Sequence, residues 1–224
     1  MLERGDLLAL HEPLEGLVFI GPIDVGGERF ESATSLLAWL CDDAQHQNVF
    51  LKETVNRPVL ELVLADEGFL RDVHHAFLLR SPEEIAASWF ALEHDMRIHD
   101  AGIEALHELY VAVRAAGGHQ PVVIDSDDLV TRPDATMAAY CAAIGVPFIA
   151  RALHWEPGVR PEWERTARWH EDASASAGFE APEHRDRHQV AASDEAIEFA
   201  RHHRPFYEQL LADRLDVTGW QGRD

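Results

Sequence analysis

The most constraining feature of this sequence is the alternation between short apolar runs and longer segments with helical periodicity. Three runs are largely apolar, as is typical of strands buried on both faces of a sheet: residues 48–51, 75–79 and 121–124. Helical patterns separate them along the chain. Strands that alternate with helices in this way form open, mostly parallel sheets. The pattern therefore predicts a three-layer α/β fold in which the three runs are central strands flanked by helices.

The expected helices carry recognisable end signals. The segment 81–94 opens with Ser81, followed by Pro82 and two glutamates, which suit the N-cap, the first helical position and the first turn. The segment 103–115 is followed by two glycines that suit a C-cap. No repeat or linker divides the chain, so we expect one domain over residues 1–224. The remaining expected elements are helices at 32–45, 132–144 and 193–212 and a loop at 173–187.

The excess of acidic over basic residues limits the kinds of partner that the protein can bind. Forty acidic residues against nineteen basic ones give a formal charge of −21, which disfavours binding to nucleic acid or to anionic membranes. No apolar run approaches the roughly 18 residues that span a bilayer, and the first ten residues lack the pattern of a signal peptide. A small phosphate-bearing ligand remains compatible with this charge. We therefore expect a soluble, cytoplasmic protein that acts on small molecules.

Polar side chains follow the expected strands at the edge where α/β proteins bind ligands. Lys52, the only lysine in the chain, comes directly after the first run, and Arg80 comes directly after the second. An arginine at a strand end beside a helix N-terminus suits a phosphate or sulfate dianion, because its guanidinium joins free backbone N–H groups. Ser88, two turns into that helix, would offer a hydroxyl to the same anion. In the alternative interpretation Arg80 pairs with a carboxylate and Ser88 faces solvent.

The segment that contains these two residues resembles a known signature. Arg80, Pro82 and Ser88 have the spacing found in sulfotransferases that use 3′-phosphoadenosine 5′-phosphosulfate (PAPS), where this arginine and serine bind the 3′-phosphate. The likeness is to a bacterial branch with a P-loop-like α/β fold. Further segments resemble that branch in the same order along the chain: 11–13, 49–53, 122–147 and 169–179.

The resemblance implies a role for each matching residue. Glu12 would be the general base toward a small hydroxyl or amine acceptor, and Lys52 would stabilise charge on the transferring sulfuryl group. Alternatively, Glu12 is an exposed loop residue and Lys52 forms an ion pair with Glu53. Self-association is also expected, and neither nucleic acid nor membrane is an expected partner. The residues that would close over the adenosine phosphate are Trp169, His170, Ser174 and Ser176.

One departure from the family concerns the N-terminal region. Members of the family begin with a strand and a phosphate-binding loop well before the segment that resembles 11–13, whereas only ten residues precede His11 here. Either the start of the chain was assigned too far downstream, or this is a shortened relative that has lost half of the cofactor site. We expect that the chain as given lacks the first strand and this loop and does not hold the 5′-phosphosulfate in the usual way. A sheet without that strand would be poorly covered and prone to association.

Two other classes of function are compatible with parts of the sequence. A non-catalytic module of the same fold would bind a nucleotide or a partner without turnover. A pyridoxal-phosphate enzyme would need Lys52 for its Schiff base, although the sequence offers no phosphate cup near it. The fourteen histidines do not form the i, i+4 pair with an acidic residue that is typical of a zinc helix, so no metal is expected.

Overall fold

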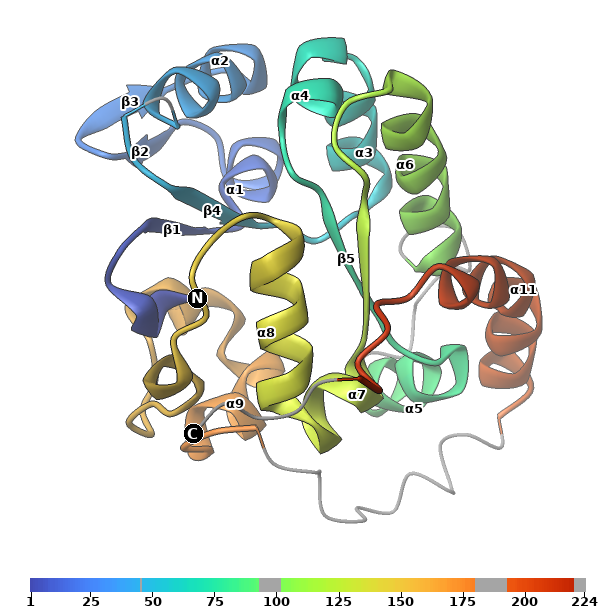
Figure 1. Cartoon of the computed structure of the whole chain (residues 1–224). Coiled ribbons are helices and arrows are strands. Elements are labelled where there is room, and N and C mark those ends of the chain that lie inside the picture. The colour runs from blue at the N-terminus through green and yellow to red at the C-terminus, as the bar shows by residue number, and fades with distance from the viewer. Residues whose placement is uncertain (45, 93–101, 180–192, 220–224) are drawn as a thin grey trace.

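The computed structural model describes residues 1–44, 46–92, 102–179 and 193–219, which form an α/β fold (Figure 1). The strands are β1 (Leu8–His11), β2 (Ile23–Val25), β3 (Glu28–Phe30), β4 (Val49–Lys52), β5 (Ala76–Leu79) and β6 (Val122–Asp125). The α-helices are α1 (Pro13–Phe19), α2 (Ala33–Asp43), α3 (Arg57–Leu64), α4 (Glu67–Asp72), α5 (Pro82–Leu92), α6 (Ile103–Ala116), α7 (Ser126–Thr131), α8 (Pro133–Ala143), α9 (Glu171–Ala175) and α11 (Asp194–Ala212). Short 3₁₀ helices are η1 (Leu2–Arg4), η2 (Ala150–Leu153) and η3 (Pro161–Trp169).

Two of the three small sheets in the described residues are parallel. β1 pairs with β4, with His11 opposite Lys52, and β5 pairs with β6, with Leu78 opposite Ile124. β2 and β3 form an antiparallel hairpin. The three predicted strands are thus confirmed as β4, β5 and β6, each shifted by at most one residue at either end. β1 was not predicted, although Leu8, Ala9 and Leu10 form a short apolar run; all four of its residues are half-buried.

The side chains of β6 alternate between two packing layers. Val123 is fully buried in the main core with residues of α3 and α6, whereas Val122 and Ile124 pack on the opposite face against Tyr140 of α8. Figure 1 shows α6 and α8 on opposite sides of the β5–β6 pair. The strand is therefore covered by helices on both faces, and the predicted layering of helix, sheet and helix is confirmed here.

Helix ends follow the chemistry of the sequence. Ser32 and Ser193 cap α2 and α11 by accepting backbone N–H groups three residues later, and Gly117 ends α6 in the left-handed conformation with φ 72°. Among the described helices, none has both the length and the apolar character needed to cross a membrane.

The loop predicted at 173–187 is wrong at its start, because α9 extends to Ala175. Two acidic residues in the first turn of α9 and a hydrogen bond from the Ser174 N–H to the His170 carbonyl support one helical turn. Residues 180–187 of that loop and 93–94 of the helix predicted at 81–94 lie outside the described residues.

Two adjacent leucines of β5 should respond very differently to truncation. The Leu79 side chain is fully buried in the main core, whereas Leu78 is 58% exposed because α8 covers β6 and leaves this position open. Leu79→Ala should lower the free energy of unfolding by about 2–5 kcal/mol, and Leu78→Ala by less than about 0.5 kcal/mol. Urea denaturation of both variants measures the difference. Equal losses would contradict this assignment of the two faces.

Candidate active site

Two charged side chains meet beyond the carboxyl ends of β1 and β4. Because the strands are parallel neighbours with His11 opposite Lys52, the residues that follow them lie side by side. The Glu12 N–H donates to the Lys52 carbonyl at 2.7 Å. The Lys52 ammonium donates to Oε1 of Glu12, and the Thr54 hydroxyl donates to the same oxygen at 2.6 Å. The Glu12 side chain is 13% exposed and Lys52 is 45% exposed, so solvent reaches the pair from the lysine side.

The backbone of Glu12 directs its carboxylate into this pair. Glu12 has φ 49° and ψ 46°, and it is the only residue other than glycine with a positive φ in the described part of the chain. This left-handed conformation costs a side-chain-bearing residue of the order of 1–3 kcal/mol and occurs most often at functional sites. Although Glu12 occupies the N-cap position of α1, its side chain makes no capping hydrogen bond. The carboxylate is therefore available to Lys52 and Thr54.

The electrostatic surroundings keep Glu12 ionised. Burial alone would raise its pKa, but the hydrogen bonds from Lys52 and Thr54 and the charge of Lys52 outweigh burial and hold the pKa below the usual value. Glu15, one turn into α1, behaves in the opposite way, because burial and the charge of Glu12 raise its pKa. At neutral pH the site thus holds a carboxylate that can accept a proton.

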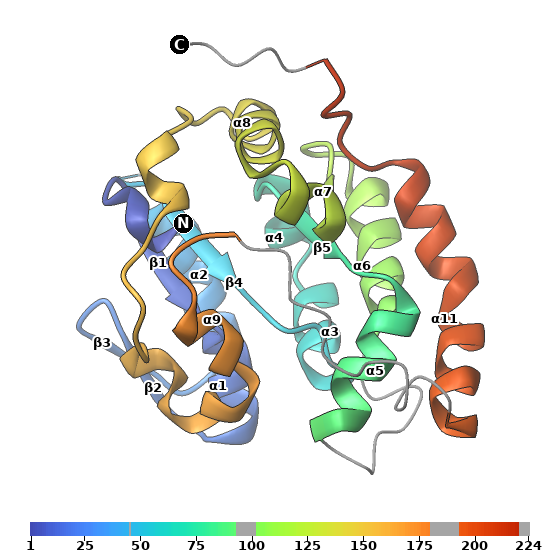
Figure 2. The same ribbon diagram turned by 90° about the horizontal axis from the view of Figure 1, so that it is seen from below.

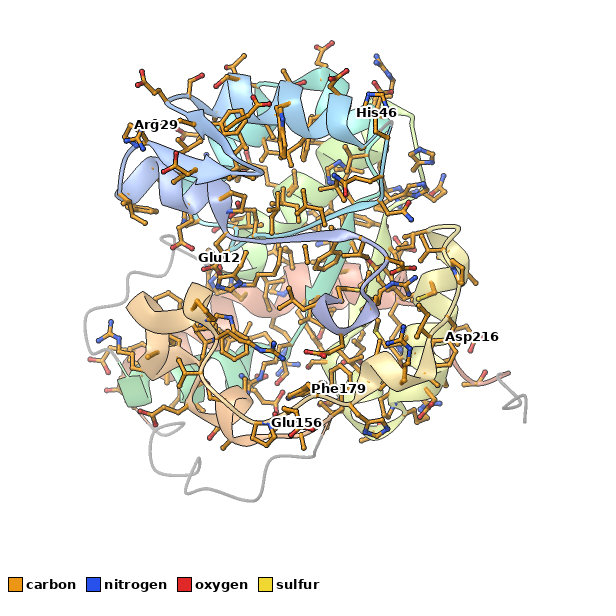
Figure 3. All side chains as sticks on the ribbon, turned by 90° about the vertical axis from the view of Figure 1, so that its left-hand side faces the viewer. Glu12, Arg29, His46, Glu156, Phe179 and Asp216 are labelled. Atoms are coloured by element: carbon orange, nitrogen blue, oxygen red, sulfur yellow. The ribbon has the colours of Figure 1, made fainter. Side chains whose placement is uncertain are left out.

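Aromatic rings form one wall beside Glu12. His170 stacks on Trp163 with ring centroids 4.7 Å apart and an interplanar angle of 16°. His11 meets His170 edge-on at 5.5 Å, and its Nε2 lies 3.3 Å from Oε2 of Glu12. Burial and the nearby His11 and Lys52 lower the pKa of His170. Figure 3 shows Glu12 beside the segment that contains η3 and α9, which supplies this wall.

The predicted anion-binding residues lie at the start of α5. Arg80 follows β5, and its Nε is 3.6 Å from Oε2 of Glu84 one turn later. Ser88 is exposed on the same helix, which packs against α11 (Figure 2). Asp127 is close enough that Glu84 and Arg80 both influence its pKa, which burial raises. The structure therefore has Arg80 paired with a carboxylate, as in the alternative interpretation, through a contact too long for a hydrogen bond.

Trp169 connects these two groups of residues. Its ring contacts Trp89, the neighbour of Ser88, at a centroid distance of 5.3 Å. The next residue, His170, lies against His11 and Glu12 at the other end, as described above. Two adjacent residues of one segment thus touch α5 and the end of β1. Glu12, Lys52 and His170 are brought together, and Trp169 links them to the helix that carries Ser88.

The two predicted serines have mainly local partners. The Ser176 hydroxyl accepts a hydrogen bond from the Trp155 indole at 3.2 Å and donates to the Ala173 carbonyl at 2.9 Å. Ser174 is half-buried, and its carbonyl accepts the Gly158 N–H at 2.8 Å. Of the described residues, no group of three or more histidine, cysteine or acidic side chains is arranged to hold a metal ion. For a bound phosphate, Arg80 supplies a cation just before the start of α5.

Sequence reasoning missed three members of this site. Thr54 shares Oε1 of Glu12 with Lys52, and its signal was its position two residues after Lys52 on the same side of an extended segment. Trp163 and Trp89 form the aromatic contacts of His170 and Trp169. Nothing in the local sequence marks either tryptophan. The contact of Trp89 with Trp169 joins segments that are distant along the chain, and the contact of Trp163 with His170 depends on the conformation of the segment between them.

Comparison with known proteins agrees with this architecture. A family model described as a sulfotransferase domain matches residues 31–213, a stretch that includes Lys52, Arg80, Ser88 and His170. A branched-chain-amino-acid aminotransferase-like protein 2 of Arabidopsis thaliana is 34% identical over 110 residues, which is 49% of this chain and 19% of that protein. The chain thus spans only a small part of that relative, and no solved structure matches it. Because the family model covers well over half of the sequence, the chain belongs to the family of sulfotransferase domains.

Proposed function

We propose that this protein transfers a sulfuryl group from PAPS to a hydroxyl or amine group of a small acceptor. Membership in the family supports sulfuryl transfer in general. The observation that supports the more specific proposal is the contact of Glu12 with Lys52 and Thr54 next to the His170 wall, in which an ionised carboxylate lies beside a cation. Trp169 then connects this reactive end to the helix of Arg80 and Ser88.

The spacing along α5 suits the 3′-phosphate of PAPS. Glu84 and Ser88 are four residues apart and face the same side of α5, and Arg80 follows the end of β5, just before this helix. A phosphate on this side would displace the Glu84 carboxylate from its 3.6 Å contact and gain the guanidinium together with the Ser88 hydroxyl. The contacting rings of Trp89 and Trp169, tilted by 60° to each other, provide aromatic surface beside that position for the adenine. The residues therefore fit the nucleotide end of PAPS.

Each residue at the reactive end would have a separate task. PAPS supplies the sulfuryl group together with an anionic leaving group. Glu12 takes the proton of the acceptor hydroxyl or amine as that atom forms its bond to sulfur. Lys52 offsets negative charge on the oxygens around sulfur, and Thr54 fixes Oε1 of Glu12. His170 and Trp163 shield one side of the site from water.

Two other functions have less support. A non-catalytic module would have no need for an ionised, strained glutamate paired with the single lysine of the chain. The aminotransferase in the name of the Arabidopsis relative implies a Schiff-base lysine, but the matching stretch covers 19% of that protein. Lys52 is already bound to the Glu12 carboxylate and to no group that resembles a phosphate cup. Neither function is therefore proposed here.

Removing the Arg80 guanidinium should weaken nucleotide binding. Isothermal titration with adenosine 3′,5′-bisphosphate should give an affinity lower by about 2–4 kcal/mol for Arg80→Ala, because one partner of a charge-assisted contact is lost. Ser88→Ala should lose about 1 kcal/mol, as expected for one hydrogen bond. Arg71→Ala is the matched control, since Arg71 is an exposed arginine that pairs with Asp72 on α4. Equal affinities for wild type and Arg80→Ala would refute the 3′-phosphate site, and no binding by the wild type would refute PAPS as donor.

A further inference from the structure

Glu53 lies between the two residues that bind Glu12 but points elsewhere. Lys52 and Thr54 both contact Oε1 of Glu12, whereas Oε1 of Glu53 accepts the backbone N–H of Leu14 in α1 at 2.6 Å. Successive side chains of an extended segment alternate in direction, which explains the division. The second oxygen of Glu53, Oε2, is buried and has no hydrogen-bond partner among the described residues.

The contact with Leu14 replaces the capping bond that α1 lacks. A helix begins with N–H groups that need acceptors, and the residue at the N-cap position ordinarily supplies one. Here Glu12 holds that position without capping, and Pro13 has no N–H to satisfy. Leu14 is fully buried, so water does not reach its N–H, and Glu53 supplies the acceptor from the end of β4.

We infer that Glu53 is a positioning residue: by capping α1 from β4, it stabilises the left-handed backbone of Glu12 and keeps the Glu12 carboxylate on Lys52 and Thr54. If Glu53 did not accept the Leu14 N–H, the nearest carboxylate able to do so would be that of Glu12 itself, at the ordinary N-cap position. Glu12 would then leave Lys52. The catalytic role of Glu12 rests on the proposed function. The effect of Glu53 on the position of the Glu12 carboxylate does not depend on it.

The charge state of Glu53 makes the idea testable with an isosteric variant. Burial, helped by the carboxylates of Glu12 and Glu15 that face it from the start of α1, raises the pKa of Glu53 to about 8 against the opposing effect of the Leu14 and Glu15 backbone N–H groups. Lys52, its neighbour on β4, points toward Glu12. Glu53 is therefore mostly neutral at pH 7, and its Oε1 accepts the Leu14 N–H without needing a charge. Glutamine offers the same acceptor oxygen, whereas alanine offers none.

The decisive measurement is the pH titration of the Glu12 carboxyl group in the full chain, monitored by carboxyl ¹³C NMR. The Glu12 resonance is assigned as the one missing from Glu12→Gln. In wild type and Glu53→Gln, Glu12 should titrate below its usual range. In Glu53→Ala, it should titrate near the ordinary value of about 4.3, because the bonds from Lys52 and Thr54 are lost. Should Glu53→Ala not fold, Glu53→Asp replaces it, since its shorter side chain does not reach the Leu14 N–H.

A matched control separates positioning from simple loss of a helix cap. Asn56 caps α3 by accepting the Val59 N–H at 3.1 Å and lies three residues after Glu53. Asn56→Ala should lower the melting temperature and leave the Glu12 titration unchanged. An unchanged Glu12 titration in Glu53→Ala, or a Glu53→Gln variant that behaves like Glu53→Ala, would overturn the inference.

Turnover assays then test the link to catalysis. Glu53→Ala should lower kcat about 10- to 100-fold with little change in KM, and Glu53→Gln should restore most of kcat at pH 7. If the wild type transfers no sulfate but the NMR titrations are as expected, the proposed function is refuted and the positioning of Glu12 by Glu53 is supported.

Discussion

Replacing Glu12 by glutamine should lower kcat by roughly 10²- to 10⁴-fold and leave the affinity for adenosine 3′,5′-bisphosphate almost unchanged. The amide has nearly the same shape and can still accept the hydrogen bond from Thr54, which is 2.6 Å from Oε1 in the wild type. It cannot take a proton from the acceptor. The loss should therefore fall on the chemical step rather than on binding, and steady-state kinetics with PAPS together with calorimetry separates the two.

The pH profile gives this prediction a second readout. Because Lys52 and Thr54 hold the pKa of Glu12 below its usual value against the effect of burial, the base stays ionised as the pH falls to about 5. The wild-type rate should therefore decline only at pH values below the ordinary titration range of glutamate. Glu61→Gln is the matched control, since it removes an exposed carboxylate of α3 that pairs with Arg57 and not with Lys52. A Glu12→Gln enzyme that turns over at the wild-type rate would refute the assignment of the base.

The strands could be predicted where burial leaves a mark on composition. β5 and β6 contain buried residues such as Phe77, Val122 and Val123, which require apolar side chains, whereas β4 was predicted from its apolar run although its residues are half-buried or exposed. β1 also has three apolar residues, and they are half-buried like those of β4. Its strand conformation depends on pairing with β4, a contact between segments about 40 residues apart that local periodicity does not reveal.

The sequence predicted several residues of the site but not most of the contacts that they make. Glu12 and Lys52 were expected together at the reactive end from the resemblance, and the structure brings them together. His170 was expected to close over the adenosine phosphate, whereas its ring lies against His11 beside Glu12. The alternative partner for Lys52 was Glu53, and that pairing is wrong, because adjacent residues of a strand end point in opposite directions. No residue type in the sequence announced the left-handed backbone at Glu12, because glutamate has no preference for it.

Replacing Lys52 by alanine should lower kcat by roughly 10²- to 10³-fold, because the charge that offsets the developing negative charge near sulfur is lost. The acid limb of the pH profile should move upward at the same time, since the Glu12 pKa loses the hydrogen bond and the charge that lower it. Lys52→Arg keeps a positive charge but distributes it over a planar guanidinium group. Compared with Lys52→Ala, it should bring the acid limb of the pH profile closer to its wild-type position, while kcat recovers less.

A double variant decides whether Lys52 acts on sulfur or only on Glu12. If Lys52 merely orients the base to which it is bonded, Lys52→Ala should add nothing to the defect of Glu12→Gln, because the base is already absent. If Lys52 stabilises the transferring group directly, its removal should lower the residual rate of Glu12→Gln by a further factor near that seen in the single variant. We expect the second result. Additive loss requires two tasks, and the 45% exposure of the ammonium leaves it free to contact an incoming anion while Glu12, at 13%, stays covered. An undiminished rate in the double variant relative to Glu12→Gln would reduce Lys52 to a residue that positions the base.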